Sequence, residues 1–95
     1  MIRRQAVADQ AIKLTFAVAD TGVPVALVSD LTAWDPSVHP MVKRSNGTRS
    51  VAVVVPTGTA VRFRYVYANG RYDNDVDADG FEPSGYGTDN CVVVA

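Results

Sequence analysis

Three aspartates within one short stretch are the residues of this sequence that most resemble a metal site. Residues 75–80, DVDADG, imitate the first half of a calcium-binding loop, D-x-D-x-D-G. Counted from Asp75, the twelfth position should hold a bidentate glutamate, but it holds Tyr86, and Glu82 comes too early. We therefore predict no EF-hand and no bound metal. A solvated acidic loop is the favoured interpretation, and a looser carboxylate site is the alternative.

His39 and Cys91 are each the single residue of their type, and together they offer a formal nucleophile–base pair. Neither has a distinguishing local signature, and zinc would need about four ligands. Cys91 begins an expected strand, which predicts a small buried apolar side chain. The carboxylates of the acidic loop lack the rigid platform that glycoside hydrolysis requires. We expect no enzymatic activity and no cofactor.

Trp34 is the only tryptophan, and it lies in a polar loop that continues into Asp35 and Pro36. An exposed indole packs well against the C–H face of a sugar ring, because the ring is amphipathic and large. A buried indole would instead close one end of a hydrophobic core. From the residues alone, both interpretations stay open.

The composition excludes several classes of protein. The chain has 95 residues, a net charge of −1 and scattered basic residues, which argues against nucleic acid as a partner. No stretch reaches the length of a membrane span, and no secretory signal is evident, so a cytoplasmic location is expected. A single cysteine cannot form an internal disulfide, which agrees with a reducing compartment.

Period-two alternation of apolar residues dominates the chain and predicts strands rather than helices. The clearest example is the segment 59–67, where apolar side chains alternate with Arg62 and Arg64. Two Asn-Gly steps, at Asn46 and Asn69, predict tight hairpin turns. The expected strands are residues 12–18, 23–28, 41–44, 50–55, 59–67 and 91–94. About six or seven short strands at this spacing predict one all-β domain, an antiparallel sandwich or small barrel, over residues 11–95 after an N-terminal extension of residues 1–10.

Residues 25–36, VALVSDLTAWDP, resemble the signature of the family 48 carbohydrate-binding modules. That signature is a hydrophobic strand followed by Gly-Asp/Ser-Phe-Asn-x-Trp, and Asp30, Trp34, Asp35 and Pro36 match its pattern here. The family includes isoamylase N-terminal domains and the glycogen-binding domain of the AMP-activated protein kinase beta subunit. Further segments are similar in order and spacing, at residues 41–44, 51–58, 63–65, 69–72 and 87–90, so the resemblance covers residues 11–95.

The resemblance implies an immunoglobulin-like antiparallel β-sandwich of the early set type that binds glycogen, starch or maltooligosaccharide. Trp34 stands at the position of one sugar-stacking aromatic residue, and Tyr72 stands where the family has a second tryptophan. Arg64 stands at the position of a sugar-contacting lysine, and its guanidinium can donate to vicinal hydroxyls. The remaining implied contacts come from the loop before the last strand, at Tyr86, Thr88 and Asn90.

We therefore expect non-catalytic binding of α-1,4-glucan. Leu31 replaces a usual phenylalanine and Tyr72 a usual tryptophan, and these replacements motivate a rival hypothesis. In that hypothesis the same sandwich has lost sugar binding and is a protein-interaction or scaffold module, which would bind its partner through an exposed edge strand.

Overall fold

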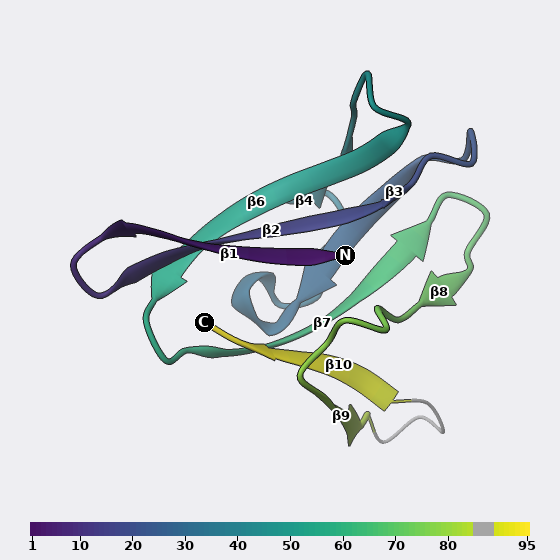
Figure 1. The fold of residues 1–95 in the computed structure, drawn as a ribbon. Coiled ribbons are helices and arrows are strands. Elements are labelled where there is room, and N and C mark those ends of the chain that lie inside the picture. The colour runs from purple at the N-terminus through teal and green to yellow at the C-terminus, as the bar shows by residue number, and fades with distance from the viewer. Residues whose placement is uncertain (85–88) are drawn as a thin grey trace.

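Alternating side chains along each strand point to opposite faces, and this places the core between two sheets. The strand β7 (Ala60–Tyr67) shows the effect most clearly, with every second residue buried from Val61 to Tyr67. Arg62 and Arg64 lie on the opposite face of the same strand. The computed structural model describes residues 1–84 and 89–95, and Figure 1 shows the strands crossing one another in two layers.

The described residues form ten strands in two antiparallel sheets. The smaller sheet has the order β1-β2-β6-β5. The larger has the order β4-β3-β7-β10-β9, with β8 also paired to β7. The remaining bounds are β1 (Ile2–Ala8), β2 (Ala11–Ala19), β3 (Val25–Ser29), β4 (His39–Pro40), β5 (Val42–Lys43), β6 (Thr48–Pro56), β8 (Tyr72–Asp73), β9 (Gly80–Pro83) and β10 (Asp89–Val94), and a 3-10 turn, η1 (Asp30–Thr32), follows β3. The prediction of an all-β antiparallel sandwich is confirmed.

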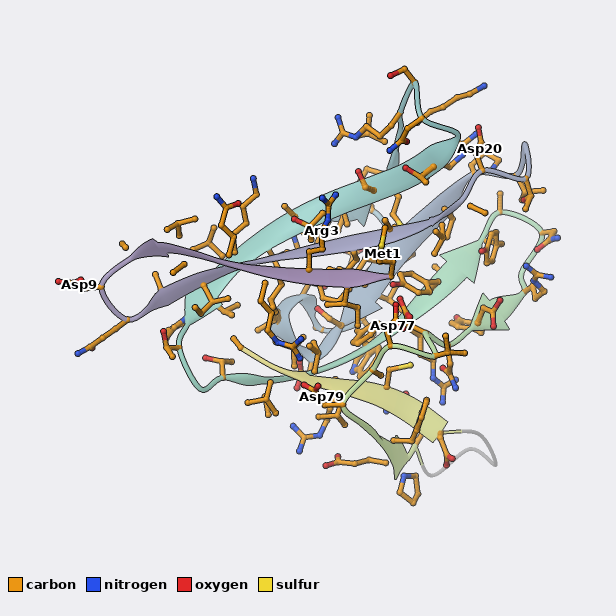
Figure 2. The ribbon with its side chains drawn as sticks, viewed as in Figure 1. Met1, Arg3, Asp9, Asp20, Asp77 and Asp79 are labelled. Carbon is orange, nitrogen blue, oxygen red and sulfur yellow. The ribbon has the colours of Figure 1, made fainter. Side chains whose placement is uncertain are left out.

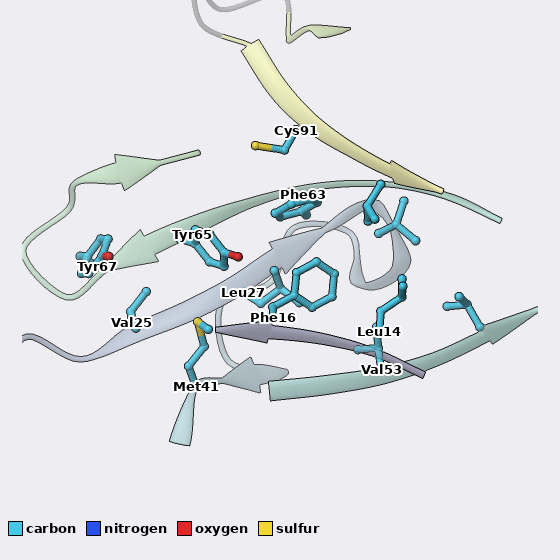
Figure 3. Close-up of a cluster of buried hydrophobic side chains, with 13 residues drawn as sticks. Leu14, Phe16, Val25, Leu27, Met41, Val53, Phe63, Tyr65, Tyr67 and Cys91 are labelled. Carbon is cyan, nitrogen blue, oxygen red and sulfur yellow. The ribbon is translucent and has the colours of Figure 1, made fainter. Parts of the chain in front are cut away.

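Inward side chains of both sheets form one buried cluster (Figure 3). Phe16 from the smaller sheet meets Phe63 from the larger one edge-on, with ring centroids 4.8 Å apart. Edge-to-face pairs of this kind stabilise by about 0.5–1.5 kcal/mol beyond the area that they bury. Cys91 is fully buried in the cluster, as predicted for a small apolar side chain.

The predicted hairpin turns are present. Gly47 has φ of 82°, a left-handed value that glycine adopts without a steric penalty, and the turn joins β5 to β6. The Asn69–Gly70 step likewise joins β7 to β8. Of the segment expected as one strand at residues 41–44, only Val42–Lys43 form a strand, β5, and a separate short strand, β4, comes just before it. β4 pairs with β3 and β5 with β6, so the chain crosses between the sheets at the buried Met41.

The structure adds strands where the sequence predicted none. Residues 1–10 were expected as an extension, but β1 pairs with β2 along its length and Ile2 packs against the core. Two further strands, β8 and β9, lie in the region expected as a loop. The residues of these strands are mostly exposed, so they show no alternation of buried and exposed positions. Their backbone pairing with a neighbouring strand makes them strands.

The strand β1 is also tied to the larger sheet by side chains. Arg4 donates to the backbone oxygen of Val94 at 2.9 Å and pairs with Asp79 at 2.5 Å. Asp79 in turn accepts the backbone N–H of Val94 at 2.7 Å. Figure 2 shows Asp79 beside β10, below the β1 strand that carries Arg3. Side-chain contacts of Arg4 therefore hold β1, an edge strand, against β10.

A helix that could span a membrane, being both long and apolar, is absent from the described residues.

Candidate functional site

The outer face of the larger sheet carries a hollow of about 380 Å³, whose described lining residues come from six separate segments. Its volume falls within the range of small-molecule sites, about 300–1,000 Å³. The lining residues are Val28, Trp34, Arg64, Tyr72, Ser84 and Asn90. Four of the six residues that the sequence implicated in sugar contact therefore meet at one place. The other two, Tyr86 and Thr88, lie outside the described residues.

Val28 forms the floor of this hollow. Leu27 points into the core, so alternation along β3 places Val28 on the outer face, where it pairs with Arg64 of β7. A valine on an outer face is normally exposed, yet Val28 is only 3% exposed. Because Trp34 lines the same hollow, we attribute this burial to the loop that folds back over the sheet. The alternation in VALVS was the signal that could have identified Val28 in advance.

Trp34 is held at the rim by an unusual backbone conformation. Ala33 and Trp34 have φ of 53° and 64°, both in the left-handed region, which is rare for a bulky residue. The Trp34 N–H donates to the backbone oxygen of Ser29 at 2.9 Å, which closes the turn after η1. The Trp34 side chain is 37% exposed and lies outside the buried core cluster. Of the two interpretations left open by the sequence, the structure favours the exposed platform over a core tryptophan.

Asp35 stabilises the outgoing side of this loop. Its Oδ1 accepts the Ser37 hydroxyl at 2.7 Å and the Ser37 N–H at 2.9 Å. These two hydrogen bonds lower the pKa of Asp35, so the carboxylate and its turn persist into mildly acidic solution. The Asp35 N–H donates to the backbone oxygen of Thr32 at 3.1 Å. The loop is thus fixed by its own polar groups.

Arg62 links the start of the tryptophan loop to β9, beside the hollow. Its guanidinium makes two hydrogen bonds to Glu82 of β9, at 2.5 and 3.2 Å. The guanidinium also lies 3.6 Å from the carboxylate of Asp30 at the start of the tryptophan loop, and that carboxylate accepts the backbone N–H of Arg62 at 3.2 Å. The hydrogen bonds and charge of Glu82, with a smaller contribution from Asp30, raise the pKa of Arg62. Arg62 was not predicted as a site residue, although its place beside Arg64 on the outer face was.

Arg64 and Tyr72 together form one wall of the hollow. The guanidinium carbon of Arg64 lies 5.9 Å from the centroid of the Tyr72 ring, at the outer limit of a cation–π contact. Tyr72 is 59% exposed on β8, next to Val66 of β7. Tyr72 therefore gives this wall an accessible aromatic surface, and Arg64 gives it guanidinium N–H groups.

Asn90 and Ser84 also line the hollow, and both have neutral polar side chains. Asn90 lies on β10 opposite Glu82, and its neighbour Cys91 points into the core. An amide side chain both donates and accepts hydrogen bonds, and a serine hydroxyl does the same. Ser84 was missed because it follows β9, a strand that the sequence pattern did not reveal.

The acidic loop is solvated in part, as the sequence favoured, at the exposed Asp77 and Asp79, but Asp75 is buried. It accepts the Tyr65 hydroxyl at 2.6 Å and the Met1 amino group at 2.7 Å, whereas Asp79 pairs with Arg4. Burial would raise the pKa of Asp75, but these hydrogen bonds outweigh it and lower the pKa. Figure 2 shows Asp77 and Asp79 at separate places along the loop. Within residues 1–84 and 89–95, no three metal-ligating side chains converge.

The pair of His39 and Cys91 offers no activated nucleophile. Burial raises the pKa of the Cys91 thiol, which disfavours the reactive thiolate. Cys91 lies in the core, where its sulfur accepts the Asp75 N–H at 3.2 Å. His39 lies on β4, opposite Leu27 of β3.

No family model matches this chain, and no curated protein matches it in sequence.

Proposed function

We propose that this protein binds α-1,4-glucan, such as glycogen, starch or maltooligosaccharide, without catalysis, in the hollow on its larger sheet. The observation that carries the proposal is the convergence of Trp34, Tyr72, Arg64 and Asn90 on one surface. These residues come from a loop and three strands that are far apart in the sequence. The family resemblance of residues 11–95 supports the same ligand class.

The chemistry of the hollow suits an uncharged ring that bears hydroxyl groups. Trp34 and Tyr72 offer exposed aromatic surface for the C–H faces of sugar rings, and Val28 provides an apolar floor. Arg64 supplies donors, and Asn90 supplies both a donor and an acceptor for neighbouring hydroxyls. Among the described lining residues, Arg64 is the one charged group, which favours a neutral ligand over an anionic polymer that would need several cations.

The affinity should be weak. Two aromatic contacts and a few hydrogen bonds leave little net free energy once the ligand has been ordered, which corresponds to a Kd in the range of roughly micromolar to millimolar. Repeated sites on a polysaccharide would raise the apparent affinity through multivalency only if several copies of the protein were linked.

The direct test is a titration with maltoheptaose followed by tryptophan fluorescence, since Trp34 is the only tryptophan. We expect a saturable change in emission and its loss in Trp34→Ala, which should remain folded because Trp34 lies outside the core. Phe81→Ala is the matched control: Phe81 is 51% exposed but does not line the hollow, so maltoheptaose binding, measured by calorimetry for both variants, should persist.

A folded wild-type protein that shows no response to several millimolar maltoheptaose would overturn the proposal. That outcome would favour the rival function, a protein-interaction module. The sheet edges give this rival limited support. The edge strands β4 and β5 have two residues each, which is short for pairing with a partner strand. The edge strand β1 is already held against β10 by a hydrogen bond from Arg4.

A further inference from the structure

We propose that the glucan site extends past Tyr72 into a second hollow, so that the protein binds a chain of glucose units that spans both. This inference rests on the proposed function and adds residues to it. The second hollow has a volume of about 150 Å³ and is lined by Arg64, Tyr72, Asp73, Asn74 and Asp89. It shares Arg64 and Tyr72 with the first hollow, and Asp89 precedes Asn90, which lines the first.

The second hollow arises from a break in strand pairing. Two strands pair with β7 on the same side: β10 ends its pairing at Phe63, and β8 begins its pairing at Tyr65. Arg64 lies between these two points along β7. Among the described residues, the ends of β8 and β10 therefore flank Arg64, and the second hollow lies beside it. The hollow is a consequence of the fold rather than of one side-chain rotamer.

The groups around this hollow suit a neutral polyol better than an ion. Asp73 and Asp89 present carboxylate oxygens, which accept hydrogen bonds from hydroxyl groups. Arg64 in the same hollow would repel a cation, and the two carboxylates would repel an anion. An uncharged sugar avoids both repulsions and can use the donors and the acceptors together.

Asn74 connects the two strand ends and is the best residue to test. Its side-chain amide donates to the backbone oxygen of Asp89 at 3.3 Å, and its backbone N–H donates to the Asp73 carboxylate at 2.9 Å. The amide oxygen of Asn74 can accept a hydrogen bond from a sugar hydroxyl. Asn74 is exposed, so its removal should not disturb the core.

The continuity of the two hollows makes a prediction about ligand length. A short ligand such as maltose fits in the first hollow alone, whereas maltoheptaose is long enough to reach across Tyr72 into the second. The wild-type protein should therefore bind maltoheptaose more tightly than maltose. The added affinity should depend on residues of the second hollow.

The experiment is to measure the Kd of maltose and of maltoheptaose by calorimetry for the wild-type protein, Asn74→Ala, Asp89→Ala and the control Asp77→Ala. Asp77 is an exposed carboxylate of the same loop that lines neither hollow. We expect Asn74→Ala and Asp89→Ala to weaken maltoheptaose binding about three- to ten-fold, the loss of one hydrogen bond, and to leave maltose binding unchanged. Asp77→Ala should change neither.

The results separate this inference from the proposed function. If the wild-type protein binds both sugars equally, or if the two variants bind maltoheptaose as the wild type does, the second hollow is not used and only this inference fails. Equal weakening of both sugars also overturns it, because it would place Asn74 and Asp89 in the first hollow. If the wild-type protein binds neither sugar, the proposed function itself fails.

Discussion

At the scale of single residues, the conformation of Ala33 and Trp34 is the feature that most directly shapes the site. Both residues have positive φ, a region that costs an L-residue roughly 1–2 kcal/mol. Such strain persists where the surrounding structure fixes it, and it often marks a functional loop. Here the hydrogen bonds of Ser29 and Thr32 to the backbone of residues 34 and 35 fix the turn.

This strain leads to a prediction for Ala33→Gly. Glycine adopts positive φ without the steric cost, and this gain offsets the entropy that glycine adds to the unfolded chain. We expect the free energy of unfolding to stay constant or to rise by up to about 1 kcal/mol. Ala52→Gly, at an exposed position in β6, is the control, and it should lose about 0.5–1 kcal/mol. Urea unfolding measures both, and equal destabilisation of the two variants would contradict the argument.

At the scale of elements, Arg62 connects the tryptophan loop to another strand of the larger sheet. It connects Asp30, at the start of η1, to Glu82 on β9, so one side chain of β7 contacts both the loop after β3 and the last strand of the sheet. Neither Asp30 nor Glu82 need contact a ligand for this linkage to matter. In the larger sheet, β7 and β10 lie between β3, which leads into the loop, and β9.

We expect Arg62→Met to loosen the loop more than it destabilises the protein. Exposed ion pairs contribute only about 0–1 kcal/mol, so thermal unfolding should change little. The emission of Trp34 should shift to longer wavelength, because a freer loop exposes the indole to water. Arg4→Met removes a similarly exposed ion pair, with Asp79, at a place away from the loop, and it should leave the emission unchanged. An unaltered spectrum in Arg62→Met would show that the loop holds its position without this link.

The elements were predicted unevenly, for physical reasons. The strands β2 and β7 follow from strict alternation of apolar and polar residues, which is a local property of the sequence. The strand β1 has exposed side chains over most of its length, so its sequence shows no alternation from which the strand could be predicted. The short strand β8 pairs with β7, and β9 pairs with β10, so the residues of β8 and β9 do not by themselves reveal a strand.

At the scale of the whole molecule, several carboxylates make the fold sensitive to acid. Hydrogen bonds from N–H, hydroxyl or charged groups lower the pKa of four aspartates, namely Asp20, Asp35, Asp75 and Asp79. Because the unfolded chain binds more protons than the folded one in acid, stability rises with pH through this range. The contribution is complete above the ordinary aspartate pKa of about 3.9 and is lost as the pH falls through the lowered values.

We therefore expect the midpoint of thermal unfolding to be nearly constant from about pH 7 to pH 5 and to fall steeply below about pH 4. Circular dichroism at a series of pH values measures this. Asp79→Asn should reduce the steepness of the fall, since it removes one of the linked carboxylates. A midpoint that stays constant down to about pH 2 would contradict the assignment of these hydrogen bonds.

The sequence by itself determined that this chain is an all-β sandwich, because alternation and turn residues act over a few neighbouring positions. It also placed Arg64 on the outer face and Trp34 in a polar loop, and the resemblance singled out Tyr72 and Asn90. Only the tertiary structure decided that these four side chains share one hollow. Their convergence depends on β10, which is distant in the sequence, pairing with the same side of β7 as the hairpin partner β8, and no local pattern encodes that long-range pairing.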